Sequence, residues 1–348
     1  MSTPEGAANP LRFCAVVTNQ HALGGDVIAQ INGELTIADA ARDFGWDGVA
    51  VTQHFLTGAW LHGIDQVAML GRLIDRTGDM SLVVSINLLA LHNPVATAEQ
   101  FASIDVLSGG RLVFGVGLGY RDEEYLAFGI DRKRMVERFE GNLAALKELW
   151  TSDEPVVDLP WCQVKGTPIS TRPLQEPRPP ILMAANADKA VVRAALRSDG
   201  WMINPHATFP TVARQLDLFS KTRREAGLPG SSRTSVAREI FCAPTRQRAL
   251  EIARPFLGAK YDAYAAWGQD RALPGDESFA IPFELLEDER FIIGTPDDCI
   301  AMLTPWIDDL HMTDFGLRTN WFGMPHEQAI ESMRLLTTEV FPALREGR

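Results

Sequence analysis

The strongest constraint on the fold is an alternation, repeated eight times, between a short apolar run and a segment with helical spacing of apolar residues. A short apolar run without polar alternation is typical of a parallel strand that is buried on both faces. The expected strands are residues 12–18, 48–52, 80–86, 112–116, 181–184, 200–203, 235–243 and 313–317. Strands that alternate with helices in this way favour an α/β fold of the (β/α)8 TIM barrel type over a doubly wound sheet.

One unit of this pattern, residues 88–129, carries an unusual glycine run. A predicted helix over 95–107 is followed by a strand, and Gly115, Gly117 and Gly119 stand at the carboxyl end of that strand. Missing side chains at alternate positions allow a large, flat group to approach the backbone. The spacing G-x-G-x-G is not the G-x-G-x-x-G fingerprint, and a charged segment follows it, so a classical dinucleotide-binding fold is rejected.

No linker divides the chain, so we expect residues 1–348 to form a single barrel domain with insertion segments. We expect a polar loop over 19–35 and an extended, proline-rich segment over 152–180. Residues 258–290 are aromatic at first and then rich in charge, glycine and proline, and a loop of that length is typical of a lid.

Composition excludes several classes of function. The net charge of −12 argues against nucleic acid and anionic membranes as partners. The N-terminus lacks the basic start and apolar run of a signal peptide, and no apolar run reaches membrane-spanning length, so we expect a cytoplasmic protein. The four cysteines are far apart, and neither they nor the histidines have metal-ligand spacing, so no metal site is expected.

The candidate catalytic residue is His54, which follows the second strand. The active sites of barrel enzymes lie at the carboxyl ends of the strands, and histidine can exchange a proton near neutral pH. The alternative is a hydrogen-bonded histidine at the barrel rim. After the third strand, Asn87, His92 and Asn93 could pair with a planar heterocycle through an amide, or could cap the segment before Pro94.

Two further places could bind ligand. Ala185, Asn186, Ala187 and Asp188 open the helix after the fifth strand, where free backbone N–H groups suit a phosphate, unless Asn186 or Asp188 caps that helix. Trp321 follows the last strand and serves either as a pocket wall or as packing.

Four stretches give the chain a resemblance to a known family. They are FGWDGVAVTQHF (44–55), the run from His92 to Gly129, PPILMAANADKAVVRAALRSDGW (179–201), and IGTPDDC (293–299) together with the closing GMPHEQA and EVFPAL. The sequence resembles the bacterial luciferase-like family of flavin-dependent oxidoreductases.

The resemblance implies a flavoprotein with monooxygenase activity, usually a homodimer. A separate flavin reductase, as a transient partner, would supply reduced FMN, and O2 would be used to oxygenate a small organic substrate. His54 would lie over the flavin near the reacting substrate, and His21 and Trp321 would line the substrate pocket. The implied cofactor contacts are Ser85, Asn87, Gly117, Tyr120, Ala185, Asn186, Ala187 and Asp188.

The resemblance also has departures and alternatives. A non-proline cis peptide is expected near Val84–Ser85, and Gln53 replaces the acidic residue common before the histidine. Gly117 and Leu118 replace the Cys-Arg pair of bacterial luciferase, so its phosphate pairing and light emission are not expected. Relatives of the same fold use the deazaflavin F420 for hydride transfer, and others are flavin-binding subunits without catalytic activity.

Overall fold

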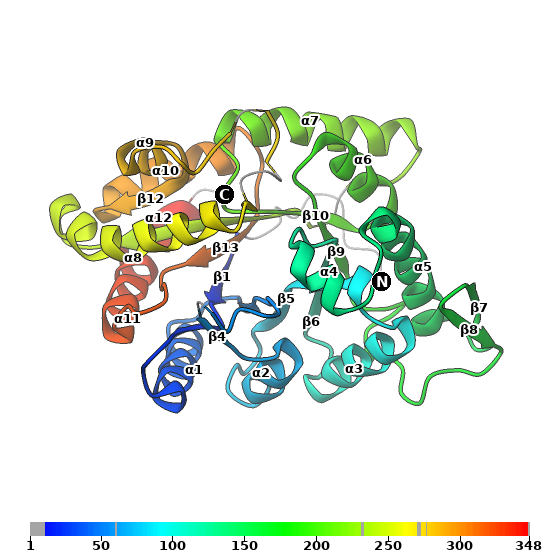
Figure 1. Ribbon diagram of the computed structural model, residues 1–348. Helices are drawn as coiled ribbons and strands as arrows, with labels where there is room; N and C mark the ends of the chain where they lie inside the picture. Colours follow the sequence, from blue (N-terminus) through cyan, green and yellow to red (C-terminus); the bar gives the residue numbers. More distant parts are fainter. Residues whose placement is uncertain (1–10, 60, 231–232, 270–272, 276, 347–348) are drawn as a thin grey trace.

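Eight parallel strands close into a barrel in the computed structural model, which describes residues 11–59, 61–230, 233–269, 273–275 and 277–346 (Figure 1). Around the barrel the order is β1, β3, β5, β6, β9, β10, β11 and β13, and β13 pairs again with β1. The strands are β1 (Arg12–Val17), β3 (Gly48–Val51), β5 (Ser81–Leu88), β6 (Leu112–Gly117), β9 (Ile181–Ala184), β10 (Gly200–Ile203), β11 (Ser235–Cys242) and β13 (Asp314–Arg318). The predicted (β/α)8 TIM barrel and its eight strands are confirmed.

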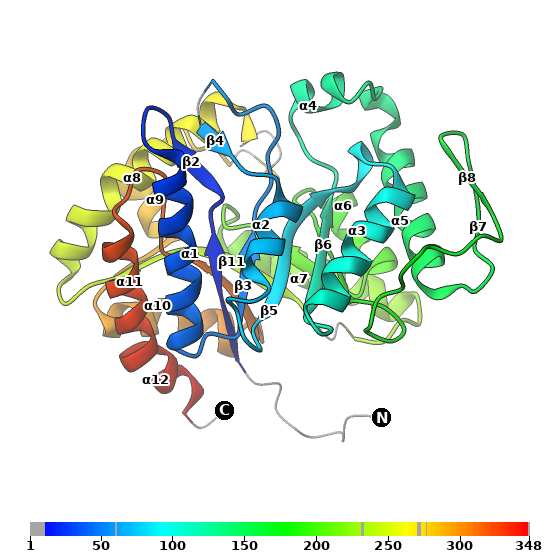
Figure 2. The same ribbon diagram turned by 90° about the horizontal axis from the view of Figure 1, so that it is seen from below.

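Helices connect the strands and cover the outside of the barrel (Figure 2). They are α1 (Val27–Asp43), α2 (Gln66–Leu73), α3 (Pro94–Leu107), α4 (Asp122–Ala127), α5 (Met135–Thr151), α6 (Asp188–Arg197), α7 (Phe209–Glu225), α8 (Arg246–Ala266), α9 (Phe283–Arg290), α10 (Pro296–Asp308), α11 (His326–Leu335) and α12 (Phe341–Arg345). Local sequence explains where helix α10 begins. Thr295 and Asp298 form a capping box at α10, with Pro296 in its first turn.

Two expectations about connections were wrong. Residues 19–35 are not a loop, because Asp26 caps α1 at Val27 and because β2 (Gln20–Ala22) pairs antiparallel with β4 (Leu61–Gly63). Residues 152–180 contain a hairpin of β7 (Val156–Leu159) and β8 (Cys162–Lys165), which stands at one edge of the molecule in Figures 1 and 2.

The segment predicted as a lid, 258–290, is largely ordered structure. Its first residues continue α8 to Ala266, and its last residues form α9. The charged and glycine-containing centre of this segment falls partly on 270–272 and 276, which lie outside the described residues. An additional strand, β12 (Phe291–Gly294), follows α9 and pairs with the carboxyl-terminal half of β11.

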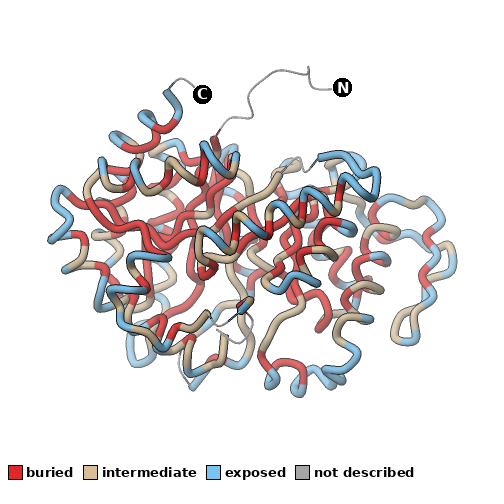
Figure 3. Tube along the Cα trace, turned by 90° about the horizontal axis from the view of Figure 1, so that it is seen from above, coloured by how far each residue is buried: buried red, intermediate tan, exposed pale blue. Residues whose placement is uncertain are grey.

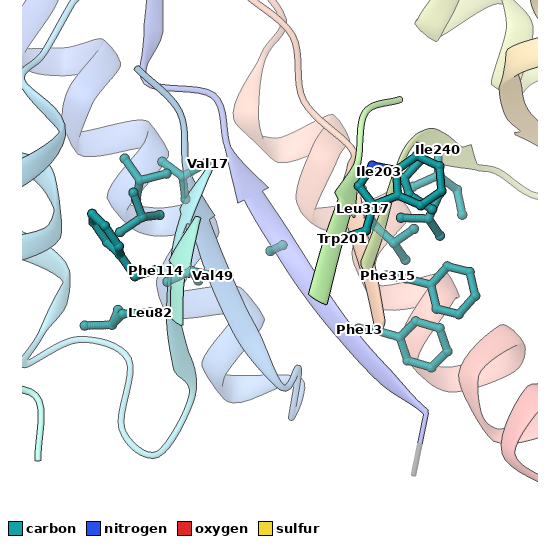
Figure 4. Packing of buried hydrophobic residues seen from close by; sticks show 14 of the residues in the cluster. Phe13, Val17, Val49, Leu82, Phe114, Trp201, Ile203, Ile240, Phe315 and Leu317 are labelled. Carbon is teal, nitrogen blue, oxygen red and sulfur yellow. The ribbon is translucent and has the colours of Figure 1, made fainter. Parts of the chain in front are cut away.

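Side chains of the strands alternate between two cores. Phe13, Phe114, Trp201 and Phe315 point outward against the helices, and Figure 4 shows Phe13 and Phe315 together on neighbouring strands. The inward set is smaller and forms a separate cluster of Cys14, Val16, Ala50, Val83, Val113, Leu182 and Met202. Buried chain accordingly fills the centre of the molecule, while exposed residues lie at its periphery (Figure 3).

Candidate active site at the carboxyl end of the barrel

Unsatisfied polar atoms gather where β1, β3 and β5 end. Among the described residues, buried side-chain atoms without a hydrogen-bond partner include Asn19 Oδ1, Gln20 Nε2, His21 Nε2, His54 Nδ1 and Asn87 Oδ1. All five belong to segments that follow or end these three neighbouring strands. Because a buried polar atom without a partner is costly, such a concentration points to a ligand that supplies the missing partners.

His54 lies just after β3, and its side chain is 16% exposed. Its Nδ1 is 3.9 Å from Oε1 of Glu124, which is beyond hydrogen-bond length. The imidazole ring packs edge-on against Tyr120 and Trp267, each with its ring centre 6.0 Å away. His54 is therefore held by aromatic packing, and its Nδ1 has no hydrogen-bond partner in the protein.

Glu124, on α4, was missed in the sequence. Its carboxylate is buried and accepts a 3.0 Å hydrogen bond from the backbone N–H of Phe55. Arg121 lies 3.5 Å from the same carboxylate oxygen and donates to the carbonyl of Phe55. The two residues fix the loop that carries His54. The usable signal was the acidic segment after the glycine run, in which Glu124 and Tyr125 are buried.

The polar residues after β5 separate into different roles. Asn93 caps α3 through the backbone N–H of Val95 at 2.9 Å, so the capping alternative is correct for Asn93. His92 packs beside Phe55 and Phe128, and burial lowers its pKa. Asn87 is 7% exposed and has an amide oxygen without a partner, which leaves it available to a ligand.

Packing explains the glycine at position 117. A Cβ atom there would stand 2.1 Å from Cδ1 of Ile86, so the space is already filled by the neighbouring strand. The non-proline cis peptide joins Ser85 to Ile86, one bond later than the expected Val84–Ser85. Ser85 is half-buried beside it. A cofactor contact at Gly117 stays a prediction.

The start of α6 has no side-chain cap, so the alternative of an ordinary cap was wrong. The Asn186 amide oxygen accepts a 2.7 Å hydrogen bond from Asn204 instead. Asp188 turns away to a bidentate pair with Arg214, at 2.7 and 2.9 Å. Ala187 is exposed and Ala185 is buried beneath it. The first backbone N–H groups of α6 are thus not satisfied by a neighbouring side chain.

His21 was expected in the substrate pocket, and it is buried beside a carboxyl group. Its Nε2 lies 4.0 Å from Oε2 of Glu34, and both side chains are 2% exposed. Burial lowers the pKa of His21 to about 4, and His326 and His62 lower it further. Burial raises the pKa of Glu34 to about 7, against hydrogen bonds from Thr18 and Asn19. At pH 7 His21 is therefore neutral, and Glu34 is divided between its protonated and ionised forms.

The end of α8 reaches across the mouth of the barrel. The Tyr120 hydroxyl is 3.1 Å from Oε1 of Gln269, and Gln269 Nε2 is 2.9 Å from Nε2 of His206. His206 Nδ1 in turn lies 3.0 Å from the Tyr261 hydroxyl. Burial lowers the pKa of His206 and raises that of Tyr120. This chain joins the loop after β6, the loop after β10 and helix α8.

Trp321 is fully buried in an ionic network at the same end. Its indole N–H donates to Glu239 at 2.6 Å, and the buried Lys260 also donates to Glu239. Burial alone would raise the pKa of Glu239, but the charges of Lys260 and Arg318 hold it below its usual value. Trp321 has this packing role, and its contact with substrate stays a prediction.

The part of the chain that the structure describes has neither a metal-binding cluster nor a membrane-spanning helix. No group of three or more His, Cys, Asp or Glu side chains in that part of the chain is arranged to hold a metal ion. Within the same residues, no helix combines the length and apolar character needed to cross a bilayer.

Two enzymes illustrate what this chain is similar to in sequence. The 4-hydroxyprotoasukamycin monooxygenase of Streptomyces nodosus subsp. asukaensis is 24% identical over 299 residues, 83% of this chain and 80% of that protein. The F420-dependent glucose-6-phosphate dehydrogenase of Amycolatopsis mediterranei is 23% identical over 325 residues, 88% of this chain and 92% of that protein.

Solved structures share the fold at low identity. Monooxygenase RslO1 from Streptomyces bottropensis has a TM-score of 0.83 and 22% identity, covering 96% of this chain and 100% of its own. The oxygenating constituent of 3,6-diketocamphane monooxygenase from Pseudomonas putida, in complex with FMN, has a TM-score of 0.80 and 16% identity, with 96% and 98% covered. A family model described as luciferase-like monooxygenase matches residues 11–309. The chain belongs to the luciferase-like monooxygenase family.

Proposed function

We propose that this oxidoreductase is a flavin-dependent monooxygenase that takes reduced FMN from a separate flavin reductase and uses O2 to oxygenate a small organic substrate. The observation that carries the proposal is the group of unpartnered polar atoms at the ends of β1, β3 and β5. A flavin ring has N–H and C=O groups along one edge and apolar faces, so it suits a site with amide and imidazole partners set among aromatic rings.

The distance to the start of α6 also fits FMN. Strands β5 and β9 are separated in the barrel by β6 alone, so their ends lie roughly 10 Å apart. FMN carries its phosphate on a ribityl chain, away from the ring. A ring held near Ser85 and Asn87 would place that phosphate near Ala185–Asp188, where an uncapped helix offers backbone N–H groups.

Each residue then has a defined task. His54 would hold or move a proton at the substrate, with its loop fixed by Glu124 and Arg121. Asn87 would pair with the ring edge, and Tyr120 would contact the cofactor from the loop after β6. Residues of α8 and its following segment would exclude water from the mouth. Bound reduced FMN supplies the chemistry that activates O2.

The second candidate is F420-dependent hydride transfer on the same barrel. It is supported by the similarity to an F420-dependent dehydrogenase over 88% of this chain. A third candidate, a flavin-binding subunit without catalytic activity, is opposed by His54, which stands at the site with Nδ1 unpartnered. A homodimer and a cytoplasmic location stay predictions.

An anaerobic binding titration separates these candidates. Purified protein is titrated with reduced FMN and, in parallel, with F420, and then O2 is admitted in the presence of a substrate library. We expect tight binding of reduced FMN and an oxygenated product. Binding of F420 alone would replace the proposal with hydride transfer, and binding of neither cofactor would overturn both enzymatic candidates. The variant Asn87→Leu should weaken FMN binding, whereas His311→Asn, at the opposite end of the barrel, should not.

A further inference from the structure

A small cavity lies inside the barrel, below the candidate active site. Its volume is about 40 Å³, and its wall includes Val16, Ala50, Val83, Val113, Leu182 and Met202. Ser85 lines its upper end, and Arg233 and Asp314 line its lower end. The cavity therefore extends along the barrel interior from the amino-terminal end to the residue predicted to contact the flavin.

Small residues in one layer of the barrel leave this space. Cys14 pairs in register with Gly48 on one side and with Gly316 on the other, and Gly316 pairs with Ala237. The Cys14 thiol already occupies the space beside Gly48, whereas Gly316 and Ala237 line the cavity and are too small to fill the interior at this level. Burial raises the pKa of Cys14 to about 12, so its thiol is neutral.

The wall does not suit water. A cavity needs only roughly 10–15 Å³ to admit one water molecule, but that molecule also needs two to four polar partners. Along the middle of the wall the side chains are aliphatic, and the charged groups at the lower end pair with each other, with Arg233 Nε 2.8 Å from Asp314 Oδ1. Apolar cavities of this kind stay dry and accept apolar gases.

A second hollow lies near the lower end of the inner cavity. It has a volume of about 530 Å³ and lies between α7 and the segment before β13, with a wall that includes Leu216, Phe219, Leu310 and Met312. Exposed residues such as Arg224 and His311 also line it, so it opens to solvent. Arg233 lines both spaces, so it lies between the outer hollow and the inner cavity.

We propose that the inner cavity is a binding site for dioxygen, and that the outer hollow delivers the gas to it past Arg233 and Asp314. The site would place O2 beneath Ser85, on the barrel side of the cofactor, while substrate occupies the mouth. O2 is small, uncharged and apolar, which matches the wall. This role for the cavity rests on the proposed function, because only an enzyme that consumes O2 needs the supply.

Xenon tests the site without any catalytic step. The protein is titrated with xenon and followed by 129Xe NMR, and a crystal is pressurised to locate the gas. Gly316→Ala adds one methyl group to the cavity wall, and its Cβ would meet Val16 Cγ2 at 3.7 Å and Ala237 at 3.8 Å, which are ordinary contacts. We expect xenon in the wild-type cavity and an affinity lowered about threefold or more in Gly316→Ala, because the methyl group takes up much of the space.

Gly71→Ala is the matched control, because a Cβ atom there meets nothing within 4 Å. It should bind xenon as the wild type does. Absence of xenon from the wild-type cavity, or equal xenon binding by Gly316→Ala, would overturn the site. A larger variant, Ala237→Val, repeats the test should the effect of one methyl group be too small to measure.

The oxygen dependence of turnover tests the route. We expect Gly316→Ala to lower kcat/KM for O2 about threefold, in proportion to its loss of xenon, with the Kd for reduced FMN unchanged. An unchanged kcat/KM for O2 in a variant that has lost xenon binding would overturn the route. Failure of the wild type to consume O2 with reduced FMN bound would instead refute the monooxygenase, and the xenon result would still decide the gas site.

Discussion

The two ends of the barrel differ in whether their buried polar groups have hydrogen-bond partners within the protein. At the amino-terminal end Asp314 accepts two 2.8 Å hydrogen bonds from Arg12 and a third from Arg233, and Asp47 accepts from the backbone N–H of Phe13. At the carboxyl end, polar atoms of Asn19, His54 and Asn87 are buried without partners.

The contrast separates stability from binding within one fold. Charges at the amino-terminal end are satisfied by the protein itself, so they hold strands and loops together. The unpartnered atoms at the other end reduce the stability of the empty protein, and a ligand would recover that loss. Substitutions at the two ends should therefore change different measured quantities.

The largest expected effect is on turnover. His54→Ala should lower kcat roughly 10²–10⁴-fold, because a positioned proton-transfer group is lost. The free energy of unfolding should fall by only about 1–2 kcal/mol, because the ring packing against Tyr120 and Trp267 is lost but no hydrogen bond of Nδ1 is. Turnover is measured with a substrate found in the screen, and the free energy of unfolding is measured by urea unfolding. His311→Asn, at the other end, is the control for general effects of losing a histidine. Unchanged turnover in His54→Ala would remove the assigned role.

The next effect is on stability alone. Asp314→Ala leaves Arg12 and Arg233 without their shared carboxylate and should lower the free energy of unfolding by about 2–4 kcal/mol, somewhat less than for fully buried pairs because both arginines are partly exposed. Urea unfolding measures this. Glu137→Ala breaks an exposed pair with Arg134 and should give no measurable change. A loss of FMN affinity in folded Asp314→Ala, at unchanged stability, would reverse the assignment of the two ends.

A smaller effect on FMN affinity is expected from the substitution of a buried asparagine, and a second buried asparagine serves for comparison. Asn87→Leu should weaken FMN binding about tenfold, or about 1.4 kcal/mol, and leave stability within about 0.5 kcal/mol, because its amide oxygen has no partner to lose. Asn142 donates to two carbonyls and accepts from Trp161 at 2.8 Å. Asn142→Leu should therefore lower stability by about 2–3 kcal/mol and not act on FMN directly. Equal stability losses in the two variants would contradict the contrast.

The smallest expected effect is the pH dependence of wild-type stability. The pKa of His21 falls from 6.5 to about 4 on folding, so its contribution is lost as pH decreases from about 6.5 to about 4. The pKa of Glu34 rises from 4.5 to about 7, so its contribution is gained as pH decreases from about 7 to about 4.5. The two slopes oppose each other, so His21 and Glu34 together should contribute little net slope between about pH 4.5 and 6.5.

Single variants should reveal each slope. Glu34→Gln should lose stability on acidification through that window, and His21→Gln should gain it, each by at most about 1.4 kcal/mol per pH unit. Urea unfolding at several pH values measures the difference. Identical pH profiles for the two variants would show that the two groups do not titrate in opposite directions.

The barrel was predictable because its strands are apolar runs, which need no knowledge of distant contacts. The start of α1 was not, because the polar residues from 19 to 26 conceal a cap and a strand that pairs with Leu61–Gly63. Within the candidate site, His54 and Asn87 follow strands and could be named from the sequence. Gln269 could not, since it contacts Tyr120 across 149 residues of sequence and lies just after α8, in a segment that the composition predicted to be a loop.

The hydrogen bond from Tyr120 to Gln269 determines whether one wall of the site offers donors or acceptors. The phenol proton goes to the Gln269 carbonyl oxygen, and the Gln269 N–H goes on to His206. Tyr120 therefore has only lone pairs left to offer. A ligand that hydrogen-bonds to Tyr120 must supply the donor. This wall therefore favours a ligand hydroxyl or N–H group and disfavours a carbonyl or carboxylate oxygen.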